Sequence, residues 1–343
     1  MGADGYLEHL FVKRVYILLV NWNGWSDTIE CLESLLFLNY PDFRIVVCDN
    51  GSSDDSLHQI RSWVDHHVSR YVEYQRAEAE SGGLPAADPV LTMIRNEENL
   101  GFAGGNNVGL RYVMARGDAD YCWLLNNDTV VEADAVAHLV ARMQQQASVG
   151  MCGSTILMYH DRSQVQALGG GHYCRWIGLP WHFGRFTRWG REVNQRRAES
   201  WMNYVEGASM LVSRQFITEV GLMCEDYFLY FEEADWAIRA KGRFRLGYAP
   251  QSIVYHKVGG SIGTSSNPAT MSYTSDYFNI RNRLLFTRRF YPAALPTVWL
   301  VIVGALLLRF CLGKRDRAMM IFRLLCGNSG PTHDVLPVYR TKP

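Results

Sequence analysis

Three short apolar runs, each followed at once by a polar cluster, constrain the fold of this chain most strongly. Residues 15–20 lead into Asn-Trp-Asn-Gly, residues 43–48 into Asp-Asn-Gly-Ser-Ser-Asp-Asp-Ser, and residues 121–125 into Asn-Asn-Asp. Short apolar, β-branched runs bounded by polar residues predict buried strands, and residues 27–37 between the first two have helical apolar spacing. This strand–helix–strand beginning predicts an α/β fold, with a mostly parallel sheet covered by helices on both faces.

The polar clusters predict where the functional site lies. In an open α/β sheet, ligands gather beyond the carboxyl ends of the strands, and three such ends carry polar residues here. A glycine-rich stretch, residues 99–107 (NLGFAGGNN), opens a further helix after a strand at 91–96. This stretch is not GxGxxG and precedes the strongest strand, so it fails as a dinucleotide fingerprint. Residues 74–88 and 169–197 lack period, and we expect a surface insertion and an acceptor-side loop region there.

The C-terminal residues 290–343 form a basic and apolar tail. Residues 290–308 carry no charge and have roughly the length needed to cross a bilayer core, although two prolines shorten the helical part. From residue 281 to the end there are eleven Lys or Arg against two Asp. Basic residues on both sides favour a helix lying on anionic lipid, while a true span and a soluble buried helix remain open alternatives.

The remaining composition bears on location. The formal net charge is zero, and we expect no nucleic-acid partner. Eight cysteines show no paired spacing and several lie in apolar runs, which indicates a reducing cytoplasm. The first twenty residues lack a basic start and a small-residue cleavage site, so they do not resemble a secretory signal. Together with the tail, these features predict a peripheral or monotopic protein at the cytoplasmic face of a membrane.

Two groups of residues carry candidate chemistry. Residues 225–239 concentrate carboxylates among aromatic residues, and burial and like-charge crowding raise a carboxyl pKa into the range of a general base. Glu232, Glu233 and Asp235 are the candidates, and an acidic helix start favoured by the helix dipole is the alternative reading. Asp128 can hold a divalent cation together with substrate phosphates, although a cluster such as Asn-Asn-Asp is more often only a turn. His256, at the end of another strand, is either structural or a metal ligand.

Eight segments, in order, resemble glycosyltransferase family 2, and within it the bacterial rhamnosyltransferase-like and galactofuranosyltransferase-like branch. They are VYILLVNWNG, VVCDNGSSDDS, NLGFAGGNN, WLLNNDT, EGASMLVSR, YFLYFEEADWAIRA, VYHKVGGS and YFNIRNRLLF, and they cover roughly residues 13–290. The resemblance implies a GT-A fold, with a Rossmann-like nucleotide-sugar-binding half at 13–150 and an acceptor-binding, catalytic half of the same domain at 151–289.

The resemblance also implies roles for single residues. It implies that the nucleotide sugar is bound by Val20, Trp22, Asp49, Asn99, Gly101, Asn107 and Asn127. It implies that Asp128 is the metal-binding last position of a DxD-like motif, that His256 completes the site, and that the metal is Mg²⁺ or Mn²⁺. The family's base is commonly the second acid of a Glu-Asp pair, whereas this chain has Glu232-Glu233. We assign the base to Glu233, leave Glu232 open, and expect Asp235 to orient the acceptor or the loop.

The expected activity follows from these roles. An inverting, metal-dependent transferase would move a sugar, with rhamnose favoured, from a dTDP- or UDP-linked donor to a hydroxyl of a glycan or polyprenyl-linked acceptor in cell-surface polysaccharide synthesis. His256 or Lys257 would add positive charge near the leaving diphosphate. A sugar nucleotidyltransferase is disfavoured, because Asn21-Trp22-Asn23-Gly24 is not the glycine-rich basic loop such an enzyme needs. The alternative from another class is a catalytically inactive, membrane-associated nucleotide-sugar-binding or scaffold protein.

Overall fold

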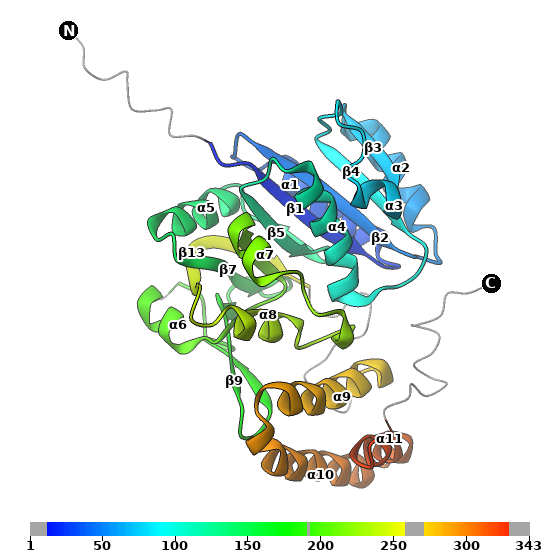
Figure 1. The fold of residues 1–343 in the computed structure, drawn as a ribbon, viewed down its shortest axis with the longest axis vertical. Coiled ribbons are helices and arrows are strands. Elements are labelled where there is room, and N and C mark those ends of the chain that lie inside the picture. The colour runs from blue at the N-terminus through cyan, green and yellow to red at the C-terminus, as the bar shows by residue number, and fades with distance from the viewer. Residues whose placement is uncertain (1–11, 191–192, 258–270, 329–343) are drawn as a thin grey trace.

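A computed structural model describes residues 12–190, 193–257 and 271–328 (Figure 1). These residues build one sheet of 13 strands, whose main path runs β10-β9-β8-β7-β12-β5-β1-β2-β4-β3. One sheet therefore continues through both halves of the predicted domain. The predicted boundary at residue 150 falls within β7 (Val149–Met158), and the boundary at 289 falls within the last turn of α9 (Tyr273–Phe290).

The N-terminal half of the sheet is parallel, as its apolar runs predicted. It contains β1 (Val15–Asn21), β2 (Phe43–Asn50), β3 (Tyr71–Gln75), β4 (Leu91–Asn96) and β5 (Tyr121–Asn126). β1 pairs in parallel register with β2 on one side and with β5 on the other. After β1, the chain thus adds β2, β3 and β4 on one side of β1 and then places β5 on the other side of β1. The carboxyl ends of β1, β2 and β5 meet at this switch point, which is where α/β sheets bind ligands.

The second half of the sheet mixes strand directions. Its further elements are β6 (Thr129–Val131), β8 (Val165–Leu168), β9 (Gly170–Cys174), β10 (Leu179–His182), β11 (Tyr204–Val205), β12 (Ser209–Ser213) and β13 (Arg245–His256). β12 lies antiparallel between β5 and β7, while β13 runs parallel to β7. β6 pairs with the end of β13 and aligns Thr129 with His256. This pairing brings His256 beside the end of β5, more than a hundred residues away in sequence.

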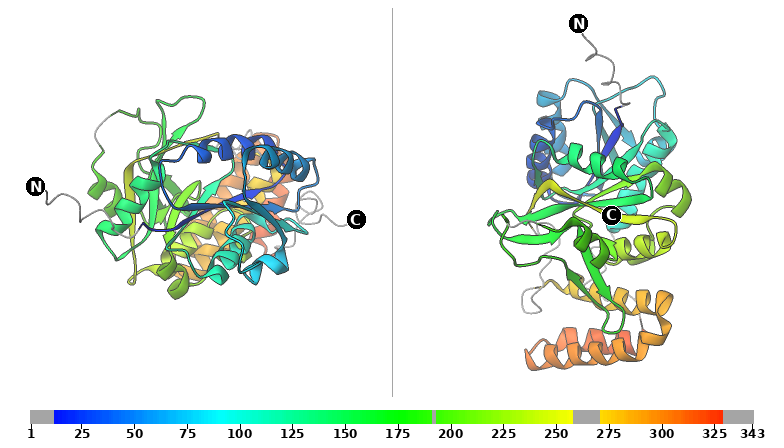
Figure 2. Two further views of the ribbon diagram at one scale, coloured as in Figure 1. Left: turned by 90° about the horizontal axis from the view of Figure 1, so that it is seen from above. Right: turned by 90° about the vertical axis from the view of Figure 1, so that its left-hand side faces the viewer.

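Helices cover both faces of the sheet (Figure 2). One apolar core lies under α1 (Trp25–Leu36), α2 (Ser56–His67) and α5 (Ala135–Gln145). The other lies under α3 (Arg76–Glu80), α4 (Gly101–Arg116), α7 (Arg214–Val220) and α8 (Glu232–Ala240). The sixth helix, α6 (Gln195–Trp201), packs against β13. A sheet buried on both faces explains why its strands read as continuous apolar runs rather than alternating ones.

Two sequence-based expectations were wrong. Residues 74–88 were expected to be a surface insertion, but Tyr74 and Gln75 end the edge strand β3 and residues 76–80 form α3. Residues 169–197 were expected to be loop, but they contain the antiparallel hairpin β9–β10. Neither segment has a long apolar period, because β3 is a short edge strand and, in the hairpin, β9 is buried in part while β10 has no buried residue.

The C-terminal part is helical, as predicted for the tail. α9 is followed by η2 (Pro292–Ala294), α10 (Leu295–Cys311) and α11 (Arg315–Leu325). These helices form a layer at the end of the molecule away from β1–β4 (Figures 1 and 2). Residues 292–311 are long and apolar enough to cross a membrane, and only 22% of that stretch is buried in the protein. The predicted absence of a secretory signal concerns residues 1–20, of which 1–11 lie outside the described residues.

Candidate active site

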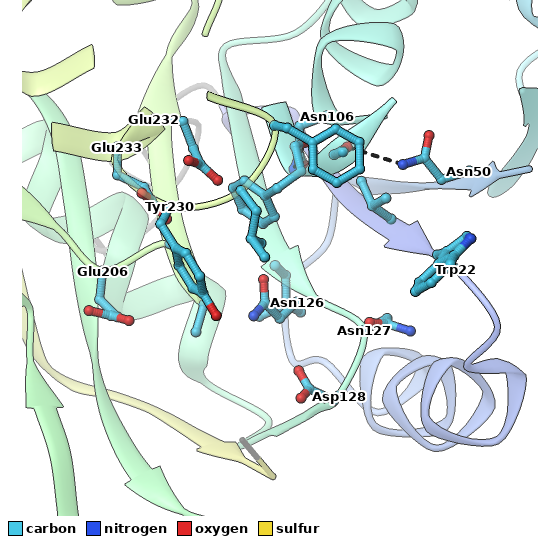
Figure 3. A pocket seen from close by; sticks show the side chains of 18 of the residues that line it. Trp22, Asn50, Asn106, Asn126, Asn127, Asp128, Glu206, Tyr230, Glu232 and Glu233 are labelled. Carbon is cyan, nitrogen blue, oxygen red and sulfur yellow. Dashed lines mark hydrogen bonds between the residues drawn. The ribbon is translucent and has the colours of Figure 1, made fainter. Parts of the chain in front are cut away.

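A pocket of about 280 Å³ lies beyond the carboxyl ends of the central strands (Figure 3). It is lined by the following residues: Val20, Trp22, Asn50, Asn99, Gly101, Phe102, Asn106, Leu125, Asn126, Asn127, Asp128, Gln166, Glu206, Gly207, Ala208, Phe228, Leu229, Tyr230, Glu232, Glu233 and His256. Two ends can be distinguished in Figure 3. We call the side with Trp22, Asn50 and Asn127 the amide end, and the side with Glu206, Glu232 and Glu233 the acid end.

The amide end is held together by asparagine side chains. Asn50 Nδ2 donates to Asn99 Oδ1 and to the Gly101 carbonyl, both at 3.0 Å. Asn50 Oδ1 in turn accepts from Asn96 Nδ2 at 3.1 Å. Asn99 Oδ1 also accepts from the Gly101 amide at 2.9 Å, where α4 begins. These bonds join the ends of β2 and β4 to the start of α4, so buried, hydrogen-bonded amides preorganise this wall of the pocket, although Asn96 Oδ1 has no partner among the described residues.

Gly101 is needed where the amide end meets the loop before α8. Its φ is +72°, and a Cβ at this position would lie 2.3 Å from the Phe228 carbonyl oxygen. The next amide, that of Phe102, donates to the same carbonyl at 2.7 Å. The glycine therefore permits both the left-handed backbone and the close approach of the two segments.

Two further residues, Trp22 and Asn127, line the pocket at the amide end. Trp22 Nε1 is buried and has no hydrogen-bond partner among the described residues. Asn127 Nδ2 donates to Thr28 Oγ1 at 2.9 Å, which ties the turn after β5 to α1. Buried donors are normally satisfied, so the unpaired indole Nε1 is an exception within this wall.

Two residues predicted to bind the nucleotide sugar lie outside the pocket wall. Asp49 is buried and accepts from Asn21 Nδ2 at 2.8 Å and from Ser52 Oγ at 2.6 Å. Asn107 Nδ2 donates to the Met223 carbonyl at 2.9 Å and to Glu225 Oε1 at 2.8 Å. Both side chains fix neighbouring loops in the structure, and the direct contacts predicted for them stay predictions. Val20, Trp22, Asn99, Gly101 and Asn127 line the pocket, and the nucleotide-sugar contacts predicted for them also stay predictions.

Asp128 and His256 meet at the base of the pocket. Their side chains are buried, and His256 Nε2 lies 3.1 Å from Asp128 Oδ1. On its other side the imidazole Nδ1 lies 2.9 Å from Gln166 Oε1, which orients the ring. Burial lowers the pKa of His256, but the facing Asp128 carboxylate outweighs burial and raises that pKa. The contact therefore places one carboxylate oxygen and one imidazole nitrogen side by side, and both atom types are ligands of divalent cations.

The donor set at this point fits a divalent cation only if substrate completes the coordination. Among the described residues, no group of three or more His, Cys, Asp or Glu side chains is placed to hold a metal by itself. One carboxylate and one imidazole leave most positions of a six-coordinate Mg²⁺ or Mn²⁺ to phosphate oxygens and water. Asp128 and His256 would hold the ion, and they fit a metal that binds together with a diphosphate.

Lys257 does not add charge to the pocket. Its ammonium donates to Asp27 Oδ1 and Glu30 Oε2 of α1, each at 2.5 Å. The expected role of Lys257 beside the leaving diphosphate is therefore not supported, because two carboxylates already neutralise it.

The acid end begins where α8 begins. Glu232 is buried, with Oε2 lacking a hydrogen-bond partner among the described residues, while Glu233 is only partly buried. The Glu233 carboxyl rests directly on Gly207, where an added Cβ would lie 1.9 Å from Oε1. Gly207 follows a strand of the other half of the sheet, so its lack of a side chain gives Glu233 its place in the pocket.

Burial sets the ionisation of these carboxyls. It raises the pKa of Glu232 to about 7. It also raises the pKa of Glu233 well above its ordinary range, and the neighbouring charges of Glu232 and Glu206 add to this rise. A carboxylate with a raised pKa is a stronger base than an exposed one, which suits proton removal from a hydroxyl group.

Glu206 is a third carboxylate at the acid end, which the sequence-based prediction missed. Its Oε2 lies 2.9 Å from His182 Nε2 in strand β10. Burial raises the pKa of Glu206, but the charge of His182 outweighs burial, and the pKa is lowered. Glu206 thus stays ionised beside two carboxyls that favour their protonated form, which gives the acid end carboxyls of two kinds.

Asp235, the third predicted catalytic residue, lies behind the pocket rather than in its wall. It is buried, and its carboxylate accepts from Arg239 Nε at 2.6 Å and from the Tyr227 hydroxyl at 3.0 Å. Arg289 of α9 approaches the same carboxylate at 3.3 Å. These contacts hold the loop before α8, which agrees with the looser role of orienting that loop.

That loop has an unusual backbone. Phe228, Tyr230 and Phe231 all have positive φ, between 65° and 78°. Non-glycine residues in this region cost of order 1 kcal/mol or more each and persist where the surroundings enforce them. Asn282 of α9 enforces them, because its Nδ2 donates to the carbonyls of Tyr227 and Leu229, both at 2.7 Å. The strained loop presents Phe228 and Tyr230 to the pocket.

The comparisons with known proteins agree with this geometry. The sequence model of "Glycosyl transferase family 2" matches residues 16–191, about half of the chain. The chain belongs to glycosyltransferase family 2. The match covers β1 to β10 and includes the amide end and Asp128.

Two curated relatives show the range of this family. The chain is 24% identical over 239 residues to a low-salt glycan biosynthesis hexosyltransferase of Haloferax volcanii, covering 68% of this chain and 64% of the relative. It is 20% identical over 256 residues to a poly-β-1,6-N-acetyl-D-glucosamine synthase of Staphylococcus epidermidis, covering 75% of this chain and 53% of the relative. The chain thus spans about half to two thirds of the length of these relatives.

A solved structure confirms the fold. The mannosyltransferase PcManGT from Pyrobaculum calidifontis, in complex with GDP-Man and Mn²⁺, superposes with a TM-score of 0.54. The sequences are 15% identical, and the match covers 93% of this chain and 88% of that one. The predicted GT-A architecture, a mostly parallel sheet with helices on both faces, is confirmed by this likeness together with the family match.

Proposed function

We propose that this chain is an inverting, metal-dependent glycosyltransferase that moves a sugar from a nucleoside diphosphate to an acceptor hydroxyl. One observation carries the proposal: a single pocket joins the Asp128–His256 pair to the partly buried carboxyl of Glu233. The Asp128–His256 pair suits a leaving diphosphate, and the Glu233 carboxyl suits an attacking hydroxyl. A solved structure of the same fold contains Mn²⁺ and a nucleotide sugar, which supports the choice of cofactor, Mg²⁺ or Mn²⁺, and of donor class.

At the amide end, the chain binds and orients the donor. The Trp22 side chain lines the pocket here, and the asparagine network holds the adjacent wall rigid. Asp128 and His256 would hold a divalent cation at the diphosphate side of the pocket. When bound, that cation supplies positive charge where the bond from the anomeric carbon to the diphosphate breaks.

At the acid end, Glu233 acts as general base. Its carboxylate takes the proton of the acceptor hydroxyl while the hydroxyl oxygen forms a bond to the anomeric carbon. The diphosphate leaves from the opposite face with the electron pair of the broken bond, so configuration inverts. Glu232 is too deeply buried for direct contact with an acceptor and acts through its charge on Glu233.

We further propose rhamnose as the donor sugar, linked to dTDP or UDP. The resemblance to the rhamnosyltransferase-like branch supports this choice. The pocket also supports it, since Phe228 and Leu229 give an apolar surface for the methyl group of a 6-deoxy sugar. A hydrophobic contact of this size discriminates a methyl from a hydroxymethyl group only modestly, by roughly 10- to 200-fold.

The proposed acceptor is a lipid-linked glycan, such as a polyprenyl-diphosphate sugar, at the cytoplasmic face of a bacterial membrane. The apolar residues 292–311 support this location, because they are largely exposed in the structure. One relative is named a polysaccharide synthase and another a glycan biosynthesis enzyme, which supports a role in polysaccharide synthesis.

The test is release of nucleoside diphosphate from dTDP-rhamnose, UDP-galactofuranose and UDP-glucose, with membrane extract as acceptor source. We expect release from one donor, dTDP-rhamnose first, and loss of that release when EDTA removes the metal. Release that persists in EDTA would contradict metal dependence. Nucleotide binding without release from any donor would favour the inactive scaffold.

A further inference from the structure

The outer face of α10 and α11 carries large apolar side chains that no described part of the chain covers. Eight of the sixteen large apolar residues exposed in the described part of the chain lie between Trp299 and Phe322. On α10 they include Trp299, Leu300, Leu307 and Phe310, whose successive spacings of one, seven and three residues place them on one face of the helix. We call the exposed surface of α10, α11 and residues 175–178 the apolar platform.

The tip of the β9–β10 hairpin joins this platform. Thr297 at the start of α10 donates through Oγ1 to the Trp176 carbonyl at 2.5 Å. The Trp176 side chain is 48% exposed, and Trp299 on α10 is 43% exposed. Arg175 lies over the Trp176 ring, 5.2 Å from its centre. Exposed tryptophans beside basic residues are typical of surfaces that contact the interfacial region of a membrane.

The charge of the platform is one-sided. Asp316 is the only acidic residue in the described segment 291–328. On α11, the exposed side chains of Met319 and Phe322 are flanked by the exposed Arg315 and Arg323. Apolar residues with basic neighbours on the same helix face favour anionic lipid over neutral lipid.

A buried ion pair determines how α10 meets a bilayer. Arg309 on α10 is buried and makes two hydrogen bonds to Asp276 on α9, at 3.1 and 2.8 Å. Val298 and Ile302 on the same side of α10 are fully buried in a core shared with α9 and α11. A bilayer-crossing α10 would have to leave α9, which would separate this pair and move Arg309 into hydrocarbon.

We propose that the apolar platform binds the surface of an anionic bilayer, with α10 lying in the membrane plane rather than crossing it. This deepens the proposed function and rests on it for the lipid-linked acceptor. The core beneath the platform reaches the pocket, since Phe228 and Leu229 line the pocket and pack in the same core as Ile302 and Met320. The phenyl rings of Phe228 and Phe278 on α9 stack with centres 4.8 Å apart. An acceptor sugar on a lipid carrier therefore meets the pocket wall next to the bilayer.

The test is flotation of the full chain with preformed vesicles, either of phosphatidylcholine alone or of phosphatidylcholine mixed with phosphatidylglycerol. We expect binding mainly to the mixed vesicles. Leu300→Asp combined with Leu307→Asp should weaken that binding on the order of 100-fold, because two leucines that are exposed in the protein would no longer be buried in the bilayer. Arg315→Glu combined with Arg323→Glu should weaken it about 30-fold or more, at roughly 1 kcal/mol per basic residue. The control is Phe37→Asp, which changes an apolar residue that is 80% exposed after α1 and should leave binding unchanged.

Other results would overturn the platform proposal. One such result is that the Leu300→Asp/Leu307→Asp variant binds vesicles as well as the unaltered chain does. Another is that the unaltered chain does not bind vesicles and light scattering shows a dimer that the two leucine substitutions abolish. Bound protein that resists alkaline extraction would contradict the in-plane arrangement. Donor turnover is measured separately with the same preparations. Vesicle binding without transfer would count against the proposed function alone, while transfer without vesicle binding would count against the platform alone.

Discussion

The two ends of the pocket both contain buried polar side chains, but these side chains differ in charge and in hydrogen bonding. At the amide end, Asn50 and Asn99 have hydrogen-bond partners and carry no charge. At the acid end, Glu232 and Glu233 are crowded carboxyls whose pKa values are raised by burial, and Glu232 Oε2 lacks a partner among the described residues. The amide end is thus a rigid receptor for a ligand. The acid end holds groups whose proton affinity is raised, which suits chemistry rather than binding.

The largest effect should come from removing the base. Glu233→Gln keeps the size of the side chain but cannot take a proton, so we expect kcat to fall about 10³-fold. Nucleoside diphosphate release under saturating donor measures this. Glu233→Asp is the matched control, since it restores a carboxylate and should recover part of the activity. Full activity of Glu233→Gln would remove this residue from the mechanism.

Displacing the base without changing it should have the next largest effect. Gly207→Ala places a Cβ 1.9 Å from the present position of Glu233 Oε1, so the carboxyl must move. A displacement near 1 Å costs roughly 100-fold in turnover. Steady-state kinetics should show a fall in kcat with little change in donor KM. A changed donor KM with normal kcat would mean that Gly207 shapes the amide end instead.

Breaking the amide network should act on binding and stability. Asn50→Ala leaves Asn96 Nδ2 and the Leu100 amide without their acceptor, Asn50 Oδ1. Unpaired buried groups cost about 1–3 kcal/mol, so we expect a lower Tm and a donor KM raised about tenfold. The kcat at saturating donor should change least, and a kcat loss as large as that of Glu233→Gln would contradict the division between the two ends.

The smallest effect should be a shift in pH dependence. Glu233 must be ionised to act, so its raised pKa places the acid limb of kcat/KM above the ordinary carboxyl range. Glu232→Gln removes a neighbouring negative charge and should move that limb to lower pH. Glu206→Gln should move it in the same direction by less. A limb that stays in place in both variants would show that another group controls it.

The same Glu232→Gln variant also tests the buried charge at the acid end through the pH dependence of the free energy of unfolding. The pKa of Glu232 is about 7 in the folded protein and about 4.5 in the unfolded chain. The folded state therefore binds the extra proton between these values, and stability falls as pH rises from about 4.5 to 7. Glu232→Gln should raise the free energy of unfolding at pH 8 by up to about 3 kcal/mol relative to pH 4. Thermal unfolding at the two pH values measures this.

The sequence predicted local features better than contacts between residues that are far apart in the chain. The strand at residues 91–96 matches β4, and polar clusters after β1 and β5 lie at the pocket as expected. Asn50 was missed although it directly follows Asp49, because successive strand residues point to opposite faces and the sequence does not say which faces the ligand. Its place before Gly51 at the end of a buried strand was the available signal.

Other site residues were missed because long-range packing places them. Glu206 enters the pocket through β12 and pairs with His182 of a hairpin that has no clear period in sequence. Gln166 orients His256 across 90 residues. The only local sign of Glu206 was its position as the single carboxylate of the segment EGASM, directly before Gly207. Asn282 lies on α9 and holds the strained loop before α8, and the residues next to Asn282 in the sequence gave no indication of that role.

The most direct test of the division between the two ends is titration of nucleoside diphosphate, with Mn²⁺, into three proteins: the unaltered chain, Asp128→Ala and Glu233→Gln. The account predicts that the unaltered chain and Glu233→Gln bind equally, while Asp128→Ala binds at least about tenfold more weakly and loses its response to Mn²⁺. Normal, Mn²⁺-dependent binding by Asp128→Ala, or a loss of binding in Glu233→Gln as large as that in Asp128→Ala, would contradict it.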